Sequence, residues 1–124
     1  MPALPVQVQA NAASGSQWVE TYTLQNDDGT LMTITGKTFE FSIRPTVNDT
    51  SPSPLVKVVS TGATAQGYIT VNTTASTVQV VLSPTATTLL GQGARPYMLW
   101  MDPGLSDQLA VVEGTFYSHL VAAP

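Results

Sequence analysis

Few side chains in this sequence could perform catalysis. His119 is the only histidine, and the chain contains no cysteine. A catalytic nucleophile needs a base beside it, and protein zinc sites are built mainly from histidine and cysteine. His119 lies in a stretch that alternates like a strand, where a lone histidine is usually a surface or interface residue. We therefore expect no enzyme activity, no catalytic residue, no metal site and no cofactor.

Three other patterns resemble ligand sites, and each has a simpler interpretation. Asp27 and Asp28 resemble part of a calcium loop, but the ligand spacing and the closing glutamate of an EF-hand are missing, so we interpret them as turn residues. The segment 91–93 has two glycines, but a strand pattern follows it instead of the helix of a phosphate-binding loop. Glu20 and Glu40 fall on separate predicted strands, and nothing marks them as an acid/base pair.

Charged residues are sparse and mostly acidic. They make up 10% of the 124 residues, and the net charge is −4. The basic residues Lys37, Arg44, Lys57 and Arg95 are too scattered to form a phosphate-binding stripe, so we expect no nucleic-acid partner. No segment has the apolar length needed to cross a bilayer, and residues 1–10 do not resemble a signal peptide. We expect no membrane association and synthesis in the cytoplasm.

Short alternating segments separated by turns dominate the chain after residue 16. Roughly seven to nine strands at such spacing predict an all-β fold, an antiparallel β-sandwich of the immunoglobulin-like or jelly-roll type. The segments 68–71 and 77–82 are expected to form a hairpin, and Gly114 is expected to mark a bulge in the last strand. The predicted strands cover residues 18–24, 31–35, 38–44, 55–60, 68–71, 77–82, 94–101 and 108–120.

One helical segment and one core face stand out within this pattern. A capping serine, a proline at the first helical position and a closing glycine predict one or two helical turns over residues 83–91. Phe39, Phe41 and Ile43 share one face of a strand by period-two alternation. We predict that all three are buried.

The first sixteen residues differ from the rest of the chain. Pro2 and Pro5 disfavour a helix, residues 6–9 alternate as a strand does, and residues 10–16 are mostly small. We interpret residues 1–16 as an extended N-terminal arm and residues 17–124 as the sandwich domain, with a frayed terminus as the alternative. Residues 2–12 are predicted to lie against another protein chain by strand addition, and not against their own domain.

The order of several motifs resembles that of tailed-phage virion proteins. Residues 28–43 contain an Asp-Gly turn, then Thr-Gly, then Phe-x-Phe-x-Ile, and residues 95–101 and 112–116 supply two closing strand motifs. Over residues 17–121 the chain is similar to a group of small virion proteins and to the N-terminal sandwich of phage upper-baseplate proteins. The resemblance implies a scaffold role in the virion and supplies no catalytic residues.

From these observations we predict a capsid decoration, or cement, protein that stabilises the shell by binding major capsid subunits. It would be made in the host cytoplasm, reside in the virion and form a homo-oligomer on the particle. Contacts are expected in the arm, in the proline-containing loop 45–54 and in the turn 102–107. The predicted interface residues are Pro5, Val6, Val8, Val47, Pro52, Pro54, Pro103 and Leu105.

Two alternatives stay open. A tail or baseplate adaptor would use the same domain, with tail or baseplate proteins as its partners. A carbohydrate-binding surface domain would stack Trp18, Tyr97 and Trp100 on sugars.

Overall fold

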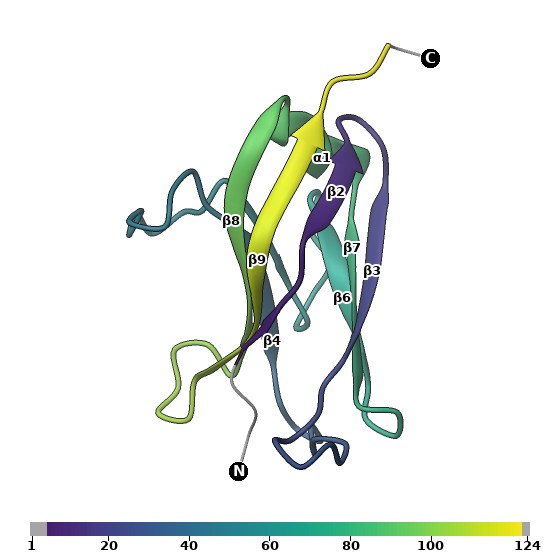
Figure 1. The fold of residues 1–124 in the computed structure, drawn as a ribbon, viewed down its shortest axis with the longest axis vertical. Helices are drawn as coiled ribbons and strands as arrows, with labels where there is room; N and C mark the ends of the chain where they lie inside the picture. The colour runs from purple at the N-terminus through teal and green to yellow at the C-terminus, as the bar shows by residue number, and fades with distance from the viewer. Residues whose placement is uncertain (1–4, 123–124) are drawn as a thin grey trace.

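A computed structural model describes residues 5–122, which form two facing β-sheets and one short helix (Figure 1). This confirms the predicted all-β sandwich. The hairpin is also confirmed, because the strands over residues 67–72 and 77–82 pair in antiparallel fashion. The elements are β1 (Val6–Gln7), β2 (Ala10–Ala13), β3 (Trp18–Thr23), β4 (Phe39–Ile43), β5 (Val56–Val59), β6 (Gly67–Asn72), β7 (Thr77–Leu82), α1 (Pro84–Leu90), β8 (Gly93–Met101) and β9 (Leu109–His119).

The strands divide unequally between the two sheets. The larger sheet has the order β1-β9-β8-β4-β5, and β2 also pairs with β9. The smaller sheet has the order β3-β7-β6. Pairs within the smaller sheet and within β9-β8-β4-β5 are antiparallel, whereas β1 and β2 run parallel to β9. The sandwich is therefore antiparallel except at the edge that the N-terminal segment occupies.

An aromatic cluster fills the space between the sheets. Phe39, Phe41 and Ile43 are at most 1% exposed, which confirms the predicted core face of β4. Trp18 of the smaller sheet lies 4.9 Å from Phe116 and 5.6 Å from Phe41, measured between ring centroids. Tilted and edge-on aromatic pairs of this kind stabilise a core beyond the area they bury. Through Trp18, this cluster packs β3 against the larger sheet.

The helix forms where its capping residues predict it. The Ser83 hydroxyl accepts a hydrogen bond from the Ala86 amide at 3.3 Å, and a proline occupies the first helical position. The buried Thr87 hydroxyl donates to the Ser16 carbonyl at 2.8 Å and accepts from the Gly15 amide at 3.1 Å. The helix is thus tied to the turn between β2 and β3. Among the described residues, no helix is long and apolar enough to cross a membrane.

The predicted strand over residues 31–35 does not form. Only an isolated bridge between Gln25 and Leu31 is present there. The alternating apolar residues do point inward, since Met32 and Ile34 are buried. The Met32 carbonyl is bonded by the Ser76 hydroxyl at 2.6 Å instead of by a neighbouring strand. Alternation therefore predicted the buried face correctly but not the pairing.

The bulge in β9 lies at Val111, and the prediction that placed it at Gly114 is wrong. The register changes from Leu99 opposite Val112 to Trp100 opposite Ala110, which leaves Val111 without an opposite residue. Gly114 serves another purpose. A Cβ atom there would lie 2.0 Å from the Val8 carbonyl oxygen, so only glycine allows this backbone approach.

That close approach belongs to the N-terminal segment, and the prediction that residues 2–12 lie against another chain is wrong for residues 6–12. The segment 6–13 pairs with β9 of its own domain, from Val6 opposite Val112 to Ala13 opposite His119. This pairing is possible because Ala10 and Ala12 are small enough to lie buried against the core. The segment is therefore an internal edge strand. Residues 2–4 of the predicted arm lie outside the described residues.

Candidate interaction surfaces

The residues that resembled chemical sites have structural roles or lie apart. The Asp28 carboxylate accepts the Thr30 hydroxyl at 2.6 Å and the Thr30 amide at 3.0 Å, and these bonds lower the pKa of Asp28. Glu20 and Glu40 lie in different sheets, on β3 and β4. Within residues 5–122, no three histidine, cysteine or acidic side chains form a group that could hold a metal ion.

The eight predicted interface residues fall in three separate regions. β4 runs from Phe39 opposite Met101 to Ile43 opposite Tyr97, so the loop after β4 and the turn after β8 leave the sheet at opposite ends of this pair. The exposed side chains among the eight include Val47, Leu105 and Val6. The regions are the β1 edge (Pro5, Val6, Val8), the loop 45–54 (Val47, Pro52, Pro54) and the turn 102–107 (Pro103, Leu105).

The first candidate surface is a hollow on the outward face of the larger sheet, beside the loop 45–54. Its volume is about 400 Å³. Met98 and Trp100 of β8 form a partly exposed apolar floor. Val47 of the loop also lines the hollow, and 82% of its surface is exposed. We call this the outer-face hollow, and it is lined by Ser42, Arg44, Thr46, Val47, Asp49, Pro96, Met98, Trp100 and Glu113.

Internal hydrogen bonds hold the loop 45–54 in place. Arg44 donates to the Asp49 carboxylate at 3.1 Å and to the Ser51 carbonyl at 2.8 Å, while the Ser51 hydroxyl donates to Asp49 at 3.0 Å. Partial burial opposes ionisation of Asp49, but the bonds from Arg44 and Ser51 outweigh it and lower the pKa of Asp49. The wall of the hollow is thus ordered before any partner binds, which reduces the entropy cost of binding.

Sequence reasoning found Val47 but missed the floor of this hollow. The alternation of β8 carried the signal, because Tyr97, Leu99 and Met101 face the core and the residues between them must face outward. What the sequence did not reveal is that β8 lies at the centre of the larger sheet, beside β4. That pairing brings Met98 next to the loop that follows β4.

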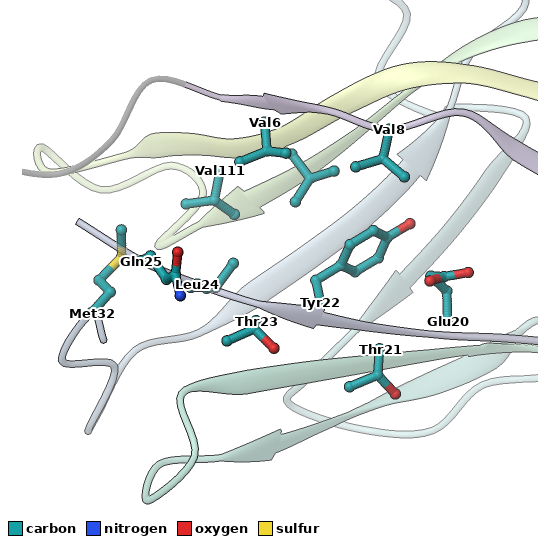
Figure 2. A pocket seen from close by; sticks show the side chains of 11 residues that line it. Val6, Val8, Glu20, Thr21, Tyr22, Thr23, Leu24, Gln25, Met32 and Val111 are labelled. Atoms are coloured by element: carbon teal, nitrogen blue, oxygen red, sulfur yellow. The ribbon is translucent and has the colours of Figure 1, made fainter. Parts of the chain in front are cut away.

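The second candidate surface is a cleft of about 210 Å³ between β1 and β3, along the open side of the sandwich (Figure 2). Figure 2 shows Glu20 and Tyr22 pointing from β3 toward Val6 and Val8, whereas Thr21 points away. We call this the open-edge cleft, and it is lined by Val6, Val8, Glu20, Thr21, Tyr22, Thr23, Leu24, Gln25, Met32, Val111 and Val112.

Tyr22, which lines this cleft, is hydrogen-bonded to Tyr97 in the core. Tyr22 donates to the Tyr97 hydroxyl at 3.4 Å, and Tyr97 donates to the Val8 carbonyl at 2.5 Å. Burial raises the pKa of both phenols, and for Tyr22 the bond to Tyr97 adds to the effect. Both groups are neutral donors, and Tyr97 attaches the N-terminal segment to the core.

The third region, the turn 102–107, is fixed by a buried carboxylate. Asp102 accepts the Thr38 amide at 2.9 Å and pairs with Lys37 at 3.1 Å, and Lys37 also pairs with Asp107 at 3.0 Å. The Thr38 amide is the main cause of the lowered pKa of Asp102, and Lys37 contributes further. Leu105 is held at the tip of the turn, 59% exposed.

Comparison with known proteins identifies no relative of this chain. No protein-family model matches this chain, and no curated protein matches it. The structure does change one alternative. Trp18 is 8% exposed and Tyr97 is 1% exposed, so neither can stack on a sugar as suggested for a carbohydrate-binding domain. Of the three proposed aromatic residues, only Trp100 reaches the surface.

Proposed function

We propose that this protein is a non-enzymatic structural component of a tailed-phage virion, which decorates the capsid and binds major capsid subunits through the outer-face hollow and the loop 45–54. The phage assignment rests on the motif order over residues 17–121. The binding role rests on the surface described above.

One observation carries the binding role. Val47, an exposed apolar side chain on an ordered loop, lies beside the apolar floor formed by Met98 and Trp100. Met, Trp and Arg are enriched in protein interfaces, and all three types line this hollow. Val47 is the most exposed large apolar side chain of the described chain. An apolar anchor held in place by Arg44 and Asp49 suits repeated contact with identical subunits, where many weak attachments add up.

We also propose immunoglobulin-type connectivity for the sandwich, in preference to a jelly roll. The orders β3-β7-β6 and β9-β8-β4-β5 correspond to strands B-E-D and G-F-C-C′ of the immunoglobulin fold. In this correspondence the N-terminal segment, parallel to β9, covers the edge beside strand G. This fold serves many functions, so it does not by itself favour a capsid over a tail.

Co-sedimentation tests the proposal directly. Shells and tails lacking this protein, purified separately from the phage that encodes it, are each mixed with the purified chain. We expect binding to shells, and Val47→Asp should weaken it about tenfold because a charge would be buried at the contact.

Leu89→Asp provides a matched control, since it introduces the same charge at an exposed leucine on α1. It should leave binding to shells unchanged. Binding to tails alone would favour the tail adaptor and contradict the capsid assignment. Equal loss of binding with both variants would contradict the role of the outer-face hollow.

A further inference from the structure

β3 is an edge strand with an unpaired side. In the described chain, β3 pairs with β7 on one side, and no strand pairs with its other side. Proteins usually protect such edges with lysine, proline, bulges or short strands. β5 has four residues and contains Lys57, and β1 has two residues and follows Pro5. β3 has six residues in unbroken register and none of these protections, and the same is true of β6 at the other edge of the smaller sheet. β3 differs from β6 because it carries an inward acidic side chain, Glu20.

The backbone groups on the unpaired side of β3 can be identified. The Leu24 amide bonds the Ser76 carbonyl at 2.9 Å, which continues the ladder from β3 to β7. Backbone direction alternates along a strand, so Glu20 and Tyr22 bond β7 as Leu24 does. Val19, Thr21 and Thr23 therefore direct their N–H and C=O groups to the unpaired side. Their side chains are exposed, so a new strand meets no obstacle from them.

Glu20 restricts what can bind this edge. It points into the open-edge cleft (Figure 2), and no cation lies within 4 Å of its carboxylate in the described chain. A strand added to β3 would place one side chain directly opposite Glu20 and another opposite Tyr22, in the close, non-hydrogen-bonded positions. An acidic side chain opposite Glu20 would be repelled, an apolar one would strip water from the carboxylate, and a basic one would be attracted.

We propose that β3 and the open-edge cleft bind an extended segment of another protein, which adds to β3 and places a lysine or arginine opposite Glu20 and an apolar side chain opposite Tyr22. The apolar wall formed by Val6, Val8 and Val111 receives the second side chain. Glu20 therefore selects the partner as well as protecting the edge from unmatched strands. This site lies apart from the outer-face hollow and does not depend on the virion assignment.

Two peptides test the proposal. One is acetyl-Ser-Thr-Val-Thr-Lys-Thr-Val-Thr-Ser-amide, whose valines and lysine share one face, and the other has glutamate in place of lysine. In an NMR titration of the full chain, the lysine peptide should shift the amides of Val19, Thr21 and Thr23. It should bind roughly tenfold more tightly than the glutamate peptide, as attraction replaces repulsion opposite Glu20.

Exchanging the charge supplies the control. Glu20→Lys should reverse the preference, so that the glutamate peptide binds more tightly. Asp27→Lys makes a like change of charge at an exposed turn residue that does not line the cleft, and it should leave the preference intact. Absence of binding, equal affinity for both peptides, or an unchanged preference in Glu20→Lys would overturn the proposal. A dimer of the free chain that protects the Thr21 amide would also overturn it, because a second copy would then occupy the edge.

Discussion

The N-terminal segment and β3 are both edge strands on the open side of the sandwich, yet the chain treats the two edges differently. The segment 6–13 covers the edge of β9, where Gly114 permits close approach and Tyr97 bonds the Val8 carbonyl. The edge of β3 is left uncovered by the described residues and is marked by the inward Glu20. One edge is thus closed by the chain itself, whereas the other keeps backbone groups that the described residues leave unpaired.

The largest effect should come from breaking the closed edge at Gly114. Gly114→Ala places a Cβ atom 2.0 Å from the Val8 carbonyl oxygen and 3.0 Å from the Tyr97 ring. Backbone has to move, so we expect a loss of about 3 kcal/mol in the free energy of unfolding, measured with urea. Gly62→Ala is the matched control, because nothing lies within 4 Å of its added Cβ. Equal stability of the two variants would show that the segment does not dock as described.

A smaller effect should follow from removing the hydroxyl that holds the segment. Tyr97→Phe leaves the Val8 carbonyl without its donor and the Tyr22 hydroxyl without its acceptor. We expect a loss of about 1–2 kcal/mol in a urea titration. Tyr117→Phe removes a hydroxyl from an exposed ring on the outward face of β9 and should change stability little. If Tyr97→Phe leaves the free energy of unfolding unchanged, this hydrogen bond does not hold the N-terminal segment in place.

The smallest effect should be the pH dependence of stability that Asp102 causes in the turn before β9. The pKa of Asp102 is below its ordinary value of 3.8, so the ionised carboxylate stabilises the fold fully above that pH. This contribution is lost as the pH falls through the lower pKa of the folded state. The difference in unfolding free energy between the native chain and Asp102→Asn should therefore shrink in acid. Urea titrations of both chains at neutral and at acidic pH measure this difference, and a difference that does not change with pH would contradict this role of the Asp102 carboxylate.

Much of the fold could be predicted from local sequence, because alternation and capping are local. The buried face of β4 and the helix after Ser83 followed from residue types a few positions apart. The placement of residues 6–13 did not, since alternation predicts a strand but not the strand with which it pairs. The same reason explains why the outer-face hollow was missed, because Met98 and Val47 meet only through the pairing of β4 with β8.

Hydrogen exchange measured residue by residue tests the contrast between the two edges most directly. The Val8 amide bonds the Glu113 carbonyl at 3.0 Å, so it should exchange slowly in the free chain. The amides of Val19, Thr21 and Thr23 face the uncovered side of β3 and should exchange orders of magnitude faster, although they lie in a regular strand. Fast exchange at Val8 together with slow exchange at Thr21 would mean that the segment is detached and that β3 is the covered edge, which would contradict this account.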